Sequence, residues 1–230
     1  MLSRYKSLSY KFLGFFLKYL ESLFKIKTNY IHFAIKSYLN NKDGIIIEIG
    51  CHNGEDTIIL SSISRSINIY AFEPDPRISS YLKSKFIKYN NIKFFPYAVT
   101  NLDGDQLFYA TKVKGKNFKN TGSSSLLKSS NLQNISTTFK VPTIALSKIE
   151  DFENHKILLI WVDVQGAERQ VIESGRAIFD NAKLLWIEYG ECDYEKFLSR
   201  KELINLFSKT HYVSKFSNRY KKGNLLLVKK

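Results

Sequence analysis

The sequence predicts an α/β fold, a doubly wound and mostly parallel sheet that ends in one antiparallel hairpin. Three observations support this prediction. From Gly44 onward, short apolar runs alternate with helical patterns. The first run, Ile45–Ile49, is apolar at nearly every position, as expected for a strand buried on both faces. The last two predicted strands, Tyr212–Phe216 and Asn224–Lys229, are joined by a basic turn, Asn218–Gly223, that is short enough to require antiparallel pairing.

Residues 1–40 differ in character from the rest of the chain. Apolar residues recur there at helical spacing between lysines, in a run shorter than the ~20 residues that span a bilayer. Two interpretations stay open: a helix that packs on the domain or on a second subunit of a homo-oligomer, or a basic amphipathic helix whose residues 1–30 lie on an anionic membrane surface. A second helix is predicted at Ile31–Leu39. We therefore predict an N-terminal helical segment, 1–40, and a main domain, 41–230. The apolar positions are Leu8, Phe12, Phe15, Phe16, Tyr19, Leu20, Leu23 and Phe24.

The first half of the main domain alternates strand and helix. After the first strand, a loop with two glycines leads into a short helix, and the pattern then repeats. This β-α-β-α-β order predicts parallel strands with right-handed crossovers. The further predicted elements are helix Glu55–Ser62, strand Ile67–Phe72, helix Pro76–Tyr89 and strand Ile92–Ala98.

Residues 101–151 interrupt this rhythm and are predicted as an insertion. Gln106–Tyr109 and Thr138–Leu146 read as two paired strands, and Lys112–Asn134, rich in Lys, Asn, Ser and Gly, reads as a mobile loop. Regular alternation then resumes. A parallel sheet ending in one antiparallel hairpin is the Rossmann-like layout of class I methyltransferases. The resumed elements are strand Ile157–Val162, helix Ala167–Phe179, strand Lys183–Ile187 and helix Tyr194–Lys209.

Composition limits the function classes. The 230 residues carry a formal net charge of +14, which could attract nucleic acid, anionic lipid or an acidic substrate. The lysines are scattered, so a general compositional bias is the simpler explanation, and we expect no nucleic-acid partner. Cys51 and Cys192 are too few for a disulfide scaffold and lack metal-ligand spacing. With no cleavable signal peptide evident, a cytoplasmic location is expected.

The loop Gly50–Gly54 lies where a buried strand turns into a helix. Glycine at position 50 permits a sharp turn and lets a ligand approach the backbone. The spacing is G-x-x-x-G rather than the G-x-G-x-x-G of dinucleotide-binding loops, which argues against NAD or FAD. The second signal is Glu73, at the end of the next predicted strand and about 20 residues farther on, where an acid can accept hydrogen bonds from a nucleoside ribose. Together the two features predict a nucleoside-containing ligand.

Four segments give a more specific resemblance: Ile47–Gly54, Tyr70–Pro76, Pro96–Val99 and Val162–Glu168. In these segments the chain resembles the FkbM family of methyltransferases, from about Asp43 to Tyr189. The resemblance implies S-adenosylmethionine as cofactor and methylation of a hydroxyl on a sugar, glycolipid or natural product.

The resemblance also assigns roles to residues. Glu48 takes the place of the family's first acid, and Ala98 and Val99 would flank the adenine. The segment Ser123–Ser125 falls where the family often has a serine pair near the cofactor pocket. The residues implied for the methionine end are Gly50, His52, Asn53 and Gly54, and those for the ribose are Glu73, Pro74 and Asp75.

Three positions depart from the family's pattern. Gln165 stands where a Glu is usual, Trp161 where a Lys is usual, and Ser147 where an Asp is expected. The first two surround the presumed catalytic strand, so they bear on catalysis more than on the cofactor site.

Acids at the carboxyl ends of strands are the catalytic candidates, because ligands of open α/β sheets bind there. Asp163 follows the fourth parallel strand and is the first candidate for a general base or for a group that orients the acceptor; its alternative role is a helix N-cap. Glu168 could instead serve the dipole of its own helix. Glu188 ends the fifth strand. Asp163 and Glu188 could hold Mg²⁺, but we expect no metal.

Two rivals to an O-directed enzyme remain. A nucleic-acid methyltransferase is one, although the Asn/Asp-Pro-Pro-Tyr/Phe signature of amino-directed enzymes is absent. The other is a binding module that keeps the cofactor without turnover, which Gln165 and Trp161 favour.

Overall fold

The computed structural model describes residues 30–39, 42–112, 121–128, 135–152, 154–190, 197–214 and 222–230. The chain divides into two units, Met1–Asn41 and Lys42–Lys230. In the first, helix α2 spans Tyr30–Leu39, in agreement with the helix predicted there. The apolar positions between Leu8 and Phe24 lie outside the described residues. No helix in the described part of the chain is both long and apolar enough to cross a membrane.

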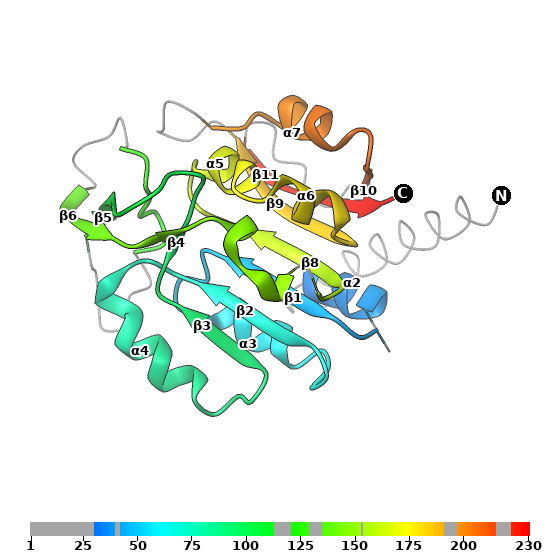
Figure 1. Cartoon of the computed structure of the whole chain (residues 1–230), viewed down its shortest axis with the longest axis horizontal. Coiled ribbons are helices and arrows are strands. Elements are labelled where there is room, and N and C mark those ends of the chain that lie inside the picture. Colours follow the sequence, from blue (N-terminus) through cyan, green and yellow to red (C-terminus); the bar gives the residue numbers. More distant parts are fainter. Residues whose placement is uncertain are drawn as a thin grey trace, which may run out of the picture. The chain divides into compact units, whose positions relative to one another are not determined.

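The second unit is built on a seven-stranded sheet with the order β10-β11-β9-β8-β1-β2-β3 (Figure 1). All neighbours from β9 to β3 pair in parallel, and β11 pairs antiparallel with both β9 and β10. The prediction of a parallel sheet with a C-terminal antiparallel hairpin is therefore confirmed. The strands are β1 (Ile45–Ile49), β2 (Asn68–Phe72), β3 (Ile92–Phe95), β8 (Ile157–Val162), β9 (Leu184–Gly190), β10 (His211–Ser214) and β11 (Lys222–Lys229).

The strand order reverses between β1 and β8. The chain leaves β1 towards β2 and β3 on one side and later enters β8 on the other, so two loops diverge at the carboxyl ends of these strands. Such a switch point is where open α/β sheets bind ligands. All five residues of β1 and all six of β8 are buried, which explains their apolar sequences.

Helices pack beside the sheet, and alternating strand residues face different clusters. Tyr70 and Phe72 of β2 belong to the large hydrophobic core cluster. Ala71, which lies between them in the strand, packs instead with Leu82 and Phe86 of α4. The helices of this unit are α3 (Glu55–Ser61), α4 (Pro76–Phe86), α5 (Glu168–Glu173), α6 (Arg176–Asn181) and α7 (Arg200–Phe207), with 3-10 turns η2 (Leu146–Lys148) and η3 (Glu150–Phe152).

Two predicted strands are each divided into two strands in the structure. The strand predicted at Ile92–Ala98 ends at Phe95, before Pro96, and resumes as the separate strand β4 (Ala98–Val99). The strand predicted at Thr138–Leu146 becomes β6 (Ile135–Val141) and β7 (Thr143–Ile144), on either side of Pro142.

The predicted helix Ala167–Phe179 divides into α5 and α6 around Gly175. A Cβ at position 175 would lie 2.7 Å from Leu146 Cβ, so this glycine allows η2 to pack closely. The helix predicted at Tyr194–Lys209 is shorter as described, because α7 begins after Ser199, whose side chain forms a capping box with Glu202.

Two small sheets complete the unit. Strand β4 pairs in parallel with β7, and β5 (Gln106–Thr111) pairs antiparallel with β6. The segment 121–128 joins β5 through a bridge between Tyr109 and Ser125. These pairings hold residues of the predicted insertion beside the carboxyl ends of β1 and β8.

Candidate active site

A cleft opens at the switch point of the sheet. Its empty volume, including space open to solvent, is about 560 Å³. The ends of β1, β2 and β8 form its floor, and β4, β5 and the segment 121–126 contribute further walls. The lining residues are Ile49, Gly50, His52, Phe72, Glu73, Pro74, Asp75, Tyr97, Ala98, Val99, Phe108, Thr121, Gly122, Ser124, Ser125, Leu126, Asp163, Val164, Gln165 and Ala167.

The turn at Gly50 brings the loop after β1 against the loop after β8. Gly50 has φ 86°, a left-handed conformation that favours glycine. A Cβ at this position would lie 2.0 Å from the carbonyl oxygen of Asp163, so no side chain fits. The amides of Gly50 and Cys51 both donate to the carbonyl of Phe72, at 2.9 and 3.0 Å. Glycine here therefore lets three strand ends meet at one edge of the cleft.

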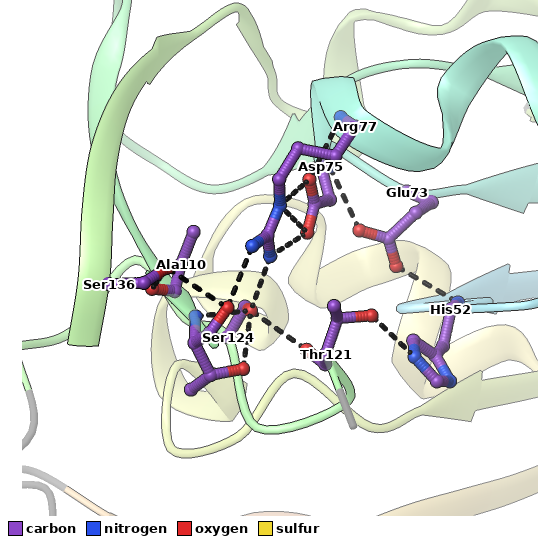
Figure 2. A network of polar contacts seen from close by, with 9 residues as sticks. His52, Glu73, Asp75, Arg77, Ala110, Thr121, Ser124 and Ser136 are labelled. Carbon is purple, nitrogen blue, oxygen red and sulfur yellow. Dashed lines mark hydrogen bonds and ion pairs between the residues drawn. The ribbon is translucent and has the colours of Figure 1, made fainter. Parts of the chain in front are cut away.

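Glu73 follows β2 directly and is held by two backbone amides. The His52 amide donates to Glu73 Oε2 and the Asp75 amide to Oε1, each at 2.9 Å (Figure 2). Each oxygen keeps a second acceptor site, so the carboxylate can still accept two hydrogen bonds from neighbouring hydroxyls. Burial raises the pKa of Glu73 to about 7, and the amide hydrogen bonds oppose that rise. This geometry fits the two hydroxyls of a ribose.

Arg77 connects the acidic turn to the segment 121–126. Its guanidinium pairs with Asp75 at 2.6 Å, donates to the Thr111 carbonyl at 2.7 Å and reaches Ser124 Oγ at 3.4 Å. Asp75 also caps α4 by accepting from the Arg77 amide. Figure 2 shows the guanidinium between Asp75 and Ser124. The carboxylate of Asp75 is therefore used in holding the wall of the cleft.

His52 closes the other end of this network. Its Nε2 lies 2.8 Å from Thr121 Oγ1, and its ring lies beside Gly122, where a Cβ would be 3.5 Å away. Its backbone amide holds Glu73. The imidazole thus contacts the segment 121–126, and the main chain of His52 positions the acid.

A cluster of polar side chains lies beyond the ends of β8 and β9. Gln165 Nε2 donates to Asp163 Oδ1 at 2.5 Å and to Glu188 Oε2 at 3.0 Å. Lys222 Nζ lies 3.2 Å from Glu188 Oε1. Burial raises the pKa of Glu188 to about 8, and the neighbouring Asp163 carboxyl adds to the effect. Glu188 therefore carries a proton at neutral pH while lying beside Asp163.

Asp163 does not serve as the N-cap of the helix that follows it. Helix α5 begins after Ala167 without any side-chain cap, so Asp163 is not its N-cap. The Asp163 amide donates to the Ile49 carbonyl at 3.0 Å, which fixes the residue at the edge of β1. Its side chain lines the cleft.

Five of the predicted site residues do not line the cleft. Glu168 is buried and accepts from the Gly166 amide at 3.0 Å within its own turn. Asn53 accepts from Lys85 through its carbonyl, and Gly54 packs against Phe86. The five are Glu48, Asn53, Gly54, Glu168 and Glu188, of which Glu188 reaches the cleft residues Asp163 and Gln165 through the contacts above.

All three departures from the family pattern now have a structural context. Trp161 is buried in β8, with its ring 5.6 Å from that of Trp186 in β9, and does not line the cleft. Gln165 does line the cleft. Ser147 lies in η2, where its amide donates to the Ser174 carbonyl.

Sequence reasoning missed several residues of the site. The apolar wall residues Phe108 and Leu126 lie in no motif, although Phe108 and Ala110 alternate as one face of a strand should. Arg77 and Lys222 are two lysine or arginine residues among 35, and nothing in the sequence marks them. Among the described residues, no group of three or more His, Cys, Asp and Glu side chains is arranged to hold a metal ion.

Glu48 gives a testable effect of pH on stability. It is 1% exposed, and its Oε2 has no hydrogen-bond partner among the described residues. Burial raises its pKa from 4.5 to about 8, so between these values the folded chain keeps a proton that the unfolded chain releases. Its contribution to stability is therefore complete below about pH 4.5 and falls as pH rises to 8, by at most about 1.4 kcal/mol per pH unit.

We expect Glu48→Gln to remove this dependence, because the amide cannot ionise. Urea unfolding between pH 5 and 8 should show the variant gaining on the wild type steadily as pH rises. Glu55→Gln, at an exposed acid of α3, is the matched control and should leave the curve unchanged. Parallel stability curves for wild type and Glu48→Gln would contradict the assignment.

Comparison with known proteins identifies the family of the chain. The model of the methyltransferase FkbM domain matches residues 48–214, more than half of the chain. The curated 2-O-methyltransferase NoeI of Sinorhizobium fredii (strain NBRC 101917 / NGR234) is 26% identical over 205 residues, which cover 86% of this chain and 84% of NoeI.

Solved structures show the same fold at low identity. Magnesium protoporphyrin IX methyltransferase (ChlM) of Synechocystis PCC 6803, with bound S-adenosylmethionine, has a TM-score of 0.50 and 9% identity, over 88% of this chain and 77% of that chain. A proposed rRNA methylase of Clostridium thermocellum has a TM-score of 0.50 and 12% identity, over 89% and 97%. At such identities the likeness extends to the fold alone.

The cleft fits S-adenosylmethionine on its own geometry. Glu73 keeps one acceptor site on each oxygen for the ribose, and the turn at Gly50 leaves no room for a side chain. Ala98 and Val99 add apolar side chains to the lining of the cleft. The chain belongs to the FkbM family of methyltransferases, and S-adenosylmethionine is its methyl donor.

Proposed function

We propose that the protein methylates a hydroxyl oxygen on a sugar, a glycolipid or a natural product. The observation that carries this proposal is Asp163, a carboxyl in the cleft beside a second carboxyl, Glu188. A hydroxyl acceptor must lose a proton, and a positioned base accelerates such a reaction by about 10²–10⁴-fold. The similarity to NoeI, a 2-O-methyltransferase, supports oxygen as the acceptor atom.

Each of these residues has a proposed role that follows from its position. Glu73 would hold the ribose, with Pro74 beside it, and Ala98 and Val99 would flank the adenine. When bound, S-adenosylmethionine supplies a methyl group on a positively charged sulfur. Asp163 accepts the proton that the acceptor hydroxyl loses, and protonated Glu188 remains as its neighbour. Correct placement of the reacting groups can itself contribute ~7–11 kcal/mol.

The segment 121–126 and the β5–β6 hairpin are proposed to face the acceptor. Thr121, Ser124 and Ser125 line the cleft with polar groups, and Phe108 adds an apolar contact. Such a mixture of hydroxyl and aromatic groups suits a small-molecule or glycan acceptor. A cytoplasmic location, a homo-oligomer and membrane contact through residues 1–30 stay predictions.

The proposal is tested by following transfer of a labelled methyl group to three acceptor panels: glycans, lipid-linked glycans and nucleic acid. We expect labelled glycan or glycolipid with the methyl group on oxygen. Label in nucleic acid alone would replace the proposed acceptor class. Binding of S-adenosylmethionine without transfer to any panel would favour a binding module.

A further inference from the structure

The side-chain amide of Gln165 contacts two carboxyls, that of Asp163 in the cleft and that of Glu188 next to it. The two hydrogens of Nε2 point to Asp163 Oδ1 and Glu188 Oε2, at 2.5 and 3.0 Å. These residues come from different elements, since Asp163 follows β8 and Glu188 lies in β9. We infer that Gln165 is a positioning residue that holds Asp163 and Glu188 together as one proton-sharing pair.

An amide suits this place because it donates twice without adding charge. Two carboxylates that contact the same amide nitrogen repel each other, which favours retention of a proton by one of them. The amide stabilises the carboxylate form of each partner and leaves the pair with a single negative charge. The proton from the acceptor hydroxyl then goes to the Asp163 carboxylate, while Glu188 keeps the proton that it already holds.

The turn fixes the amide in its position. Gln165 has φ 54°, an uncommon conformation for a residue with a side chain, and it is followed by Gly166 with φ 102°. Strained backbone of this kind is often kept where it directs a functional side chain. The Glu168 carboxyl holds the turn by accepting from the Gly166 amide.

Charged or titratable groups on three other elements surround the pair. Lys222 of β11 contacts Glu188, and Glu168 of α5 raises the pKa of Glu188 further. Glu48 of β1 lies near enough for Asp163 to raise its pKa. Burial raises the pKa of Glu48 to about 8 and that of Glu168 to about 7, and Lys222 lowers the pKa of Glu188. A glutamate at position 165 would add a third carboxyl to this cluster.

The inference extends the proposed O-methylation and is tested with a swap of amide and carboxyl. The proteins are wild type, Gln165→Glu, Glu188→Gln and the double variant. The wild type and the double variant each have two carboxyls and one amide, whereas Gln165→Glu has three carboxyls and Glu188→Gln has one. The measurements are the pH dependence of kcat and, without any acceptor, the titration of ¹³C-labelled Asp and Glu carboxyls by NMR.

We expect the acid limb of the kcat profile to rise by about one pH unit or more in Gln165→Glu, because an added like charge disfavours ionisation. At pH values below the limb, this shift lowers kcat about tenfold. Glu188→Gln should move the limb downward, and the double variant should restore it towards the wild-type position. If Gln165 only supported the fold, the acid limb would not shift upward, downward and back in these three variants.

The inference would be overturned if the acid limb of Gln165→Glu lay at the wild-type pH. It would also be overturned if the acid limb of the double variant lay at the same pH as that of Gln165→Glu. Gln165→Met is a second variant in case Gln165→Glu does not fold; it lacks the donor and should also move the limb upward. If no acceptor is methylated but the carboxyl titrations follow the expected order, the proposed function fails and the positioning role of Gln165 stands. If the carboxyls that all the variants share titrate identically in every variant, the positioning role alone is rejected.

Discussion

Replacing Glu73 with alanine is expected to weaken binding of S-adenosylmethionine by about 10²–10⁴-fold. The variant removes two hydrogen bonds between a carboxylate and the ribose, each worth ~1.5–3 kcal/mol. It also frees the amides of His52 and Asp75, which lose their acceptor. Calorimetric titration of S-adenosylmethionine into both proteins measures the change.

A control variant and the pH dependence of binding test this prediction further. Glu55→Ala removes an exposed acid outside the cleft and should bind as the wild type does. Binding to the wild type should also weaken as pH falls below about 7, because burial raises the pKa of Glu73 to that value and the protonated form has lost acceptor sites. Equal affinities of Glu73→Ala and wild type would remove Glu73 from the cofactor site.

Asp163→Asn is expected to lower kcat by about 10²–10⁴-fold, the usual contribution of a positioned base. An amide keeps the size of the side chain but cannot accept the proton from the acceptor hydroxyl. Affinity for S-adenosylmethionine should stay within a few-fold of wild type, because Glu73 and the turn at Gly50 are untouched. Single-turnover transfer of a labelled methyl group measures the rate, and calorimetry measures the affinity.

The control for this variant is Asp105→Asn, at an exposed acid before β5 that does not line the cleft. It should transfer methyl groups at the wild-type rate. Full activity in Asp163→Asn would exclude Asp163 from the reaction. A joint loss of activity and affinity would instead assign Asp163 to cofactor binding.

The order of elements could be predicted from the sequence because it depends on local patterns. Buried runs such as Ile157–Val162 and the short turn before β11 each act over a few residues. The break of the long predicted helix at Gly175 could not be predicted, because it depends on Leu146, a residue distant in the sequence.

In the site, too, the sequence could place only those residues whose position follows from a local pattern. Glu73 and Asp163 stand at strand ends, so position in a predicted sheet is enough to place them. Glu48 lies inside β1, and its side chain is buried away from the cleft. Gln165 departs from the family pattern, and only its contacts with Asp163 and Glu188 give it a role.

The close approach of Gly50 to the Asp163 carbonyl has a consequence for how such enzymes can diversify. The Gly50 loop, which adjoins the proposed donor site, and the loop of Asp163, the proposed proton acceptor, are joined through backbone atoms, since the Asp163 amide donates to the Ile49 carbonyl at 3.0 Å. The β5–β6 hairpin and the segment 121–126, which are proposed to face the acceptor, belong to neither loop. We therefore expect a change of acceptor among such enzymes to involve these outer parts more than the two loops.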